Sequence, residues 1–104
     1  MTVESYEVVS YGILLYAKDA NPIANVSLFL KGTSKKVQIG IYKSGSTLPS
    51  NNATSATFFV YFPESRLASI TDLLRNEKPV YFTYDDTTKL AYIQCNMEPT
   101  GEAE

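Results

Sequence analysis

The clearest structural pattern in this chain lies in residues 56–96, ATFFVYFPESRLASITDLLRNEKPVYFTYDDTTKLAYIQCN. Alternate side chains of a β-strand share one face, and over residues 56–62 one such face is apolar throughout: Ala56, Phe58, Val60 and Phe62. Pro63 has no N–H to donate to a sheet ladder, so it ends the strand. We therefore predict a strand over 56–62 that stops at a proline.

The residues after this proline have the spacing of an amphipathic helix over about 64–76. Glu64 lies in the first turn, where the helix dipole favours an acid. Large apolar residues recur at three- and four-residue spacing and form one stripe that we expect to face a core: Leu67, Ile70, Leu73 and Leu74. Lys78-Pro79 ends the helix, because a residue before proline avoids the α region.

Two further strands and a turn complete this unit. The strand at 80–84 places Val80, Phe82 and Tyr84 on one face. After the turn Asp85-Asp86-Thr87-Thr88, residues 90–97 return as a strand with an apolar side made of Ala91, Ile93, Cys95 and Met97. This pattern predicts a β-hairpin.

The first half of the chain predicts three more strands, over 5–17, 24–31 and 35–43. Gly12 predicts a bulge or sharp bend in the first of them. The second and third strands alternate cleanly and predict a set of inward side chains: Ala24, Val26, Leu28, Leu30, Val37, Ile39 and Ile41.

These elements predict the α+β class: a small antiparallel, strongly bent sheet or partly open barrel of about six strands, with one helix before the last two strands. The order resembles an OB-fold, in which a helix sits between the third and fourth barrel strands, and 56–62 would be an additional strand. Strand, proline and helix followed by two strands is also similar to the binding subunits of pentameric bacterial toxins. Those subunits carry a disulfide, whereas this chain has one cysteine.

We expect a single domain over 1–104, with a flexible loop at about 44–55 (SGSTLPSNNATS) and a frayed acidic tail at about 98–104. The 44% hydrophobic and 19% charged composition is that of a globular protein. No apolar run is long enough to cross a bilayer, so we predict no membrane association. The lone Cys95 and the lack of a signal-peptide pattern predict a cytoplasmic location.

The sequence offers little catalytic chemistry. Histidine is absent, which removes the commonest general base and metal ligand, and no phosphate-binding glycine motif is present. The pair Asp85-Asp86 is typical of a solvated turn and not of a cation site. We therefore predict that the protein is not an enzyme and has no catalytic residues, metal site or cofactor.

Aromatic residues are the unusual feature. Eight tyrosines and five phenylalanines make up 12% of the chain. Beyond those expected in the core, several fall on outward strand faces: Tyr6, Tyr16, Phe29, Tyr42, Phe59, Tyr61, Tyr81 and Tyr92. They can be cross-strand pairs, an interface with another protein or another copy, or a ligand platform. The ligand or interface candidates are Phe29, Lys31, Lys36, Gln38, Tyr42, Tyr61, Tyr81 and Tyr92.

We rank cross-strand pairs and a protein interface above a ligand platform for nucleic acid, because a net charge of −2 does not favour binding of a polyanion. As a homo-oligomer, the chain would associate through these aromatics or through an exposed edge strand such as 35–43. As a platform, it would bind single-stranded nucleic acid, with Phe29 and Tyr42 stacking bases while Lys31, Lys36 and Lys43 meet phosphates. A carbohydrate is a third alternative, held by tyrosines with Asn25, Gln38 and Asn96.

Overall fold

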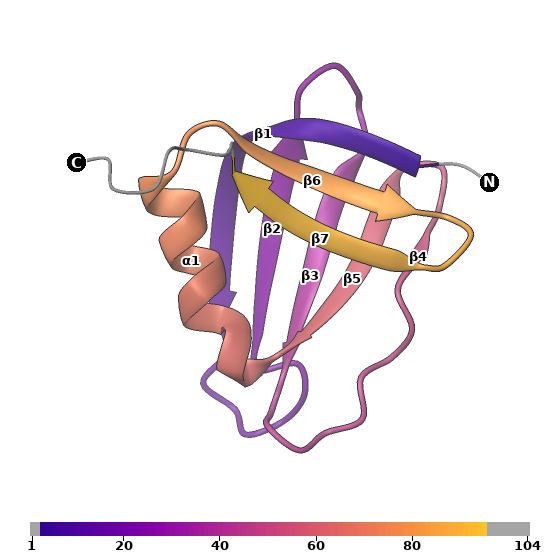
Figure 1. Ribbon diagram of the computed structural model, residues 1–104. Helices are drawn as coiled ribbons and strands as arrows, with labels where there is room; N and C mark the ends of the chain where they lie inside the picture. Colours follow the sequence, from indigo (N-terminus) through magenta and orange to yellow (C-terminus); the bar gives the residue numbers. More distant parts are fainter. Residues whose placement is uncertain (1–2, 96–104) are drawn as a thin grey trace, which may run out of the picture.

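One curled, mixed sheet of seven strands, in the order β4-β5-β3-β2-β1-β6-β7, dominates the computed structural model, which describes residues 3–95 (Figure 1). The strands are β1 (Val3–Leu15), β2 (Ala24–Leu30), β3 (Lys36–Tyr42), β4 (Asn52–Ala53), β5 (Thr57–Pro63), β6 (Val80–Asp85) and β7 (Leu90–Cys95). A 3₁₀ turn, η1 (Glu64–Arg66), leads into the helix α1 (Leu67–Asn76) between β5 and β6. The predicted α+β half-barrel with its helix before the last two strands is confirmed.

Strand β1 bends so that it belongs to both halves of the sheet. Residues 3–7 pair with β6, and the rest pairs with β2. The register shifts between Val8 and Ser10, so the bulge lies at Val9 and the prediction at Gly12 is wrong. The extra residue reverses the side-chain alternation, and Tyr6 therefore packs against the core on the same side as Tyr11. Tyr6 is not an outward aromatic.

The inward faces of β2 and β3 are as predicted. Ala24, Val26, Leu28, Val37, Ile39 and Ile41 are all 0% exposed, and Leu30 is 6% exposed. Burying each large aliphatic side chain contributes about 1.5–3 kcal/mol, so these two strands form the rigid centre of the sheet.

The third and fifth strands pair in parallel, which makes the sheet mixed rather than wholly antiparallel. The connection over 43–56 carries the chain back along the sheet, and β5 then runs beside β3 in the same direction, with Val37 opposite Phe58 and Ile41 opposite Phe62. Strand β3 thus lies between β2 and β5. The expectation that 35–43 is an exposed edge is therefore wrong.

Part of the predicted loop 44–55 is structured as β4, which pairs antiparallel with Phe58 and Phe59 of β5. Asn51 extends this contact: its side-chain oxygen accepts the Tyr61 N–H at 3.0 Å, and its side-chain nitrogen donates to the Lys89 carbonyl at 3.0 Å. The segment is tied both to β5 and to the start of β7. The predicted acidic tail at 98–104 lies outside the described residues.

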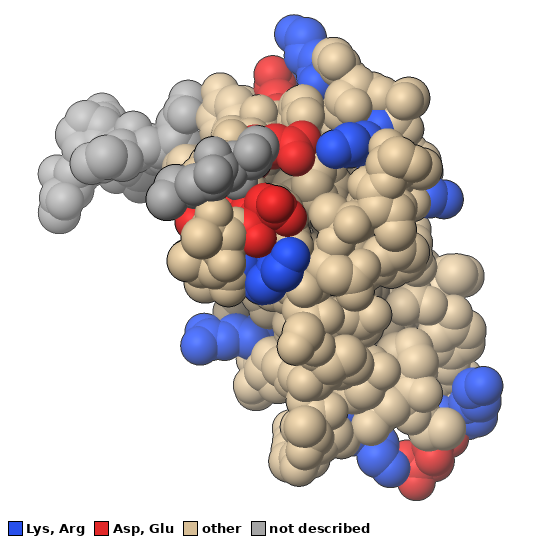
Figure 2. All heavy atoms as spheres, turned by 90° about the vertical axis from the view of Figure 1, so that its right-hand side faces the viewer, with Lys and Arg blue, Asp and Glu red and all other residues tan. Residues whose placement is uncertain are grey.

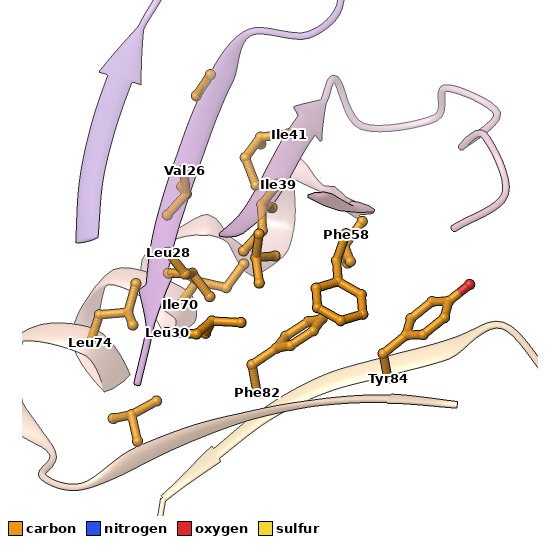
Figure 3. Close-up of a cluster of buried hydrophobic side chains, with 14 residues drawn as sticks. Val26, Leu28, Leu30, Ile39, Ile41, Phe58, Ile70, Leu74, Phe82 and Tyr84 are labelled. Atoms are coloured by element: carbon orange, nitrogen blue, oxygen red, sulfur yellow. The ribbon is translucent and has the colours of Figure 1, made fainter. Parts of the chain in front are cut away.

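The predicted helix packs its apolar stripe on the sheet. Ile70 is 6% and Leu74 9% exposed, while Leu67 and Leu73 lie partly buried against the same core. The β6–β7 hairpin closes the core from the other half of the sheet. Figure 3 shows the rings of Phe58, Phe82 and Tyr84 gathered together, with the Phe58 centroid 5.2 Å from that of Phe82 and 5.4 Å from that of Tyr84.

The hairpin turn also forms as predicted. The Asp85 carboxylate accepts the Thr87 N–H at 2.9 Å, and the Lys89 N–H donates to the Asp85 carbonyl at 2.8 Å. Ala91 and Ile93 pack on the core and Cys95 is half-buried, while Met97 lies outside the described residues.

Candidate binding surface on the outer face of the sheet

In the part of the chain that the structure describes, one face of the sheet formed by β1, β2, β3 and β5 is uncovered. Helix α1 and the β6–β7 hairpin share a single core with the inward side chains of β2, β3 and β5, so both lie on the same side of this sheet (Figures 1 and 3). Within residues 3–95, no helix or strand packs on the opposite side. We call this opposite side the outer face.

The strand registers arrange the outer face in cross-strand rows, because directly opposed residues point to the same side. One row is Ser10, Phe29, Lys36 and Thr57; the next is Gly12, Ser27, Gln38 and Phe59; a third is Leu14, Asn25, Gly40 and Tyr61. Small and polar side chains therefore occupy the middle of the face, while aromatic rings stand on β2 and β5.

Two tyrosines hold each other at one end of the face. The rings of Tyr42 and Tyr61 meet edge to face, with centroids 5.8 Å apart and planes at 82°. The Tyr61 ring also lies over Gly40, where an added Cβ would come within 3.1 Å of a ring carbon. Such aromatic pairs contribute about 0.5–1.5 kcal/mol beyond the area they bury, so Tyr61 is well fixed.

Phe29 stands at the other end of the face and is 47% exposed. The distance along β3 from Lys36, its cross-strand partner, to Tyr42 is six residues, or about 20 Å. Phe29 and Tyr42 therefore lie at opposite ends of the outer face, and Phe59 lies between them beside Gln38.

The polar groups in the middle rows bond to one another. The Ser27 hydroxyl donates to the Gln38 side-chain oxygen at 3.1 Å, and the Asn25 side-chain nitrogen donates to the Tyr16 hydroxyl. Asn96, the third polar candidate for a sugar, lies outside the described residues. These bonds occupy the Gln38 side-chain oxygen and the Asn25 side-chain nitrogen.

The four lysines in and next to β2 and β3 divide into two pairs. Lys35 points to the core side, with its Nζ 3.2 Å from Glu4 and 4.9 Å from the Phe58 ring centroid, and the Lys43 Nζ lies 3.0 Å from Asp19. Lys31 and Lys36 are exposed and make no ion pair with any residue in 3–95. Of these four lysines, the two without an ion pair therefore lie beside Phe29.

The margin of the sheet next to this face is uncharged. Residues 44–63 contain no Lys, Arg, Asp or Glu. Figure 2 views the molecule from the side of β4 and β5 and shows a broad area without charged side chains, with acidic and basic groups lying around it. An uncharged margin suits contact with a protein surface better than contact with a polyanion.

Five of the candidate residues come together on the outer face: Phe29, Lys36, Gln38, Tyr42 and Tyr61. A sixth, Lys31, lies in the turn that follows β2, two residues after Phe29. The other two lie elsewhere, because they belong to the hairpin. Tyr81 lies opposite Glu7 and Gln94, and Tyr92 lies opposite Thr83. Tyr92, 41% exposed, lines a groove of about 310 Å³ between α1 and β7.

Sequence reasoning missed the exposed apolar end of β1. Ile13, Leu14 and Leu15 are 37%, 61% and 72% exposed. The available signal was the uncharged run over 8–17, VVSYGILLYA, which is apolar on both faces and too hydrophobic for an ordinary surface strand.

Within residues 3–95, no three His, Cys, Asp or Glu side chains form a group that could hold a metal ion. The same residues contain no helix long and apolar enough to cross a membrane. No family model, no curated protein and no solved structure matches this chain.

Proposed function

We propose that this chain is a non-enzymatic binding or assembly module that docks a protein surface, either another copy or a different protein, on its outer face. The observation that supports this is the uncovered platform that carries Phe29, Phe59, Tyr42 and Tyr61 on rigid strands. Aromatic residues are enriched in protein interfaces, and rings already fixed by neighbours lose little entropy on binding. The net charge of −2 suits a protein partner.

A photo-crosslinking residue placed at Gln38 tests this proposal in cells that express the full chain. Gln38 lies in the middle row, so its replacement should give a discrete protein adduct, and an adduct of twice the chain mass identifies another copy. The same residue at Asp72, exposed on α1, is the control. Equal adducts from both positions, or an adduct from Gln38 that survives Phe59→Ala, would contradict the proposal.

Single-stranded nucleic acid is the second candidate, favoured by the position of Lys31 and Lys36 beside the exposed Phe29. Stacking of a base on Phe29 would contribute about 1–3 kcal/mol. With two lysines on phosphates, log K should fall with log salt at a slope of about −1.4.

Fluorescence polarisation with short labelled single strands decides this alternative. Lys36→Ala should weaken binding at low salt, whereas Lys89→Ala, which removes a lysine paired with Asp86 in the hairpin turn, should not. An absence of binding at low salt would exclude nucleic acid as the ligand.

For the location of the protein, we propose the cytoplasm, since the single cysteine can form no internal disulfide.

A further inference from the structure

Among the described residues, 3–95, the second half of β1 has a sheet edge with no partner strand. Strand β6 pairs with β1 only from Val3 to Glu7, while β2 occupies one side from Val8 to Leu15. On the other side, no strand within residues 3–95 pairs with residues 9–15, which form the left margin of the sheet in Figure 1. We call this side the β1 edge.

The β1–β2 register shows which backbone groups face the β1 edge. The Tyr16 N–H donates to the Ile23 carbonyl at 3.0 Å, so Tyr16 directs its backbone groups toward β2. In an antiparallel pair this direction alternates along the strand. The N–H and C=O groups of Tyr11, Ile13 and Leu15 therefore point away from β2, into the open edge.

The usual protections of an edge strand are missing here. Natural edges carry lysine, proline or inward charge, but residues 8–17 contain no proline and no charged residue. Helix α1 does not close over the edge: a cavity of about 520 Å³ separates Val8, Val9 and Tyr11 from Leu74 and Lys78. Val9, at the bulge, is 57% exposed.

The other margins of the sheet are covered or shorter. At the β5 margin, β4 covers Phe58 and Phe59 while Asn51 caps the Tyr61 N–H. At the β7 margin, the strand is six residues long and Asn51 binds the carbonyl of Lys89, just before it. Within residues 3–95 the β1 edge is therefore the longer of the two open margins, and it carries the exposed apolar side chains Val9, Leu14 and Leu15.

We propose that two copies of this chain pair through this edge, β1 against β1, antiparallel about a two-fold axis at Ile13. Identical strands in antiparallel order close into a dimer, and the uncharged run brings no like charges together. In this register Ile13 faces Ile13 of the second copy, and Tyr11 faces Leu15 of the second copy. All three edge residues then have partners for their N–H and C=O groups.

Side chains fit the same register. On the outer face, Leu14 of one copy lies opposite Gly12 of the second. A Cβ added at Gly12 meets no atom within 4 Å in the single chain, so the glycine leaves space that the 61%-exposed leucine fills. Gly12 therefore has a role in the dimer, although it does not form the bulge, which lies at Val9. Gly12 and Leu14 lie at the β1 margin of the outer face, but the pairing runs through the backbone of Tyr11, Ile13 and Leu15 and does not depend on the outer-face proposal.

Disulfide trapping in a Cys95→Ala background tests the register. Ile13→Cys places the two thiols across the axis, with Cα atoms about 5.5 Å apart, a separation that a disulfide bridges. Leu15→Cys is the matched control, because its counterpart in the second copy lies four residues further along the strand. We expect oxidised dimer from Ile13→Cys and much less from Leu15→Cys. Equal trapping of both overturns the register.

Sedimentation velocity of the full chain tests the dimer itself. Gly12→Val should change the thermal melt of the monomer little, because a Cβ at this position meets no atom within 4 Å. It should raise the dimer dissociation constant about tenfold or more by colliding with Leu14 of the second copy. Phe59→Ala, on the outer face, should leave the dimer intact. A wild-type chain that stays monomeric at high concentration, or a dimer unaffected by Gly12→Val, overturns the proposal.

Discussion

Tyr84 carries the one buried side-chain polar atom within residues 3–95 that has no hydrogen-bond partner, its hydroxyl. The residue is 1% exposed and its ring packs on Phe58 (Figure 3). An unpaired buried hydroxyl costs free energy that its removal recovers. We expect Tyr84→Phe to raise the free energy of unfolding by about 1 kcal/mol in chemical denaturation. A loss of stability would show that the hydroxyl has a partner.

Tyr6 should make stability sensitive to alkaline pH. A hydrogen bond from its hydroxyl to Glu4, at 2.7 Å, raises the pKa of Tyr6 above 10.0, and burial and the Glu4 charge act in the same direction. Because the folded-state pKa is raised, the stabilisation is present below the ordinary tyrosine pKa and is lost as the pH rises through the folded value.

The urea midpoint measured from neutral pH to above pH 10 therefore separates two chains. The difference in stability between wild type and Tyr6→Phe should be constant below about pH 9 and should shift against the wild type above about pH 10. A difference that does not change with pH would mean that the Glu4 contact is absent in solution.

Among the elements, the segment around β4 depends on one side chain. Asn51 bonds both the Tyr61 N–H and the Lys89 carbonyl, so Asn51→Ala removes two hydrogen bonds. We expect a loss of about 1–3 kcal/mol in unfolding free energy and faster hydrogen exchange at the Tyr61 amide. Asn52→Ala is the control, since Asn52 is exposed and pairs through its backbone. Equal effects from both variants would contradict this role.

The elements themselves were largely predictable, because α1, β2 and β3 have one apolar side each. Strand β1 was harder, since residues 8–15 are apolar on both faces and alternation cannot locate the bulge. The parallel pairing of β5 with β3 depends on where the long connection over 43–56 crosses the sheet. No local sequence pattern predicts the path of this connection.

At the scale of the whole molecule, long-range strand pairing also decides which candidate residues lie together on the outer face. Alternation alone placed Phe29, Gln38 and Tyr42 on the outer sides of adjacent strands. It could not show that β6 joins the first half of β1, which carries Tyr81 and Tyr92 to the other half of the curled sheet. Long-range pairing decides that separation.

The two proposed surfaces are compatible in one assembly. A two-fold axis perpendicular to the sheet at Ile13 keeps the outer faces of both copies on the same side. The edge dimer would then present two adjoining aromatic platforms, and a partner with two matching surfaces would bind more tightly than to one copy. Gly12→Val should remove this gain, because it separates the two copies.

Hydroxyl-radical footprinting of the natural protein, in cells and as the purified chain at low concentration, tests the central claim without a mutation. If the outer face docks a partner, Phe29, Phe59 and Tyr61 lose reactivity in cells, while Tyr92, exposed on the hairpin, reacts equally in both samples. Unchanged reactivity of the outer-face aromatics, or protection of Tyr92 in their place, would contradict the account.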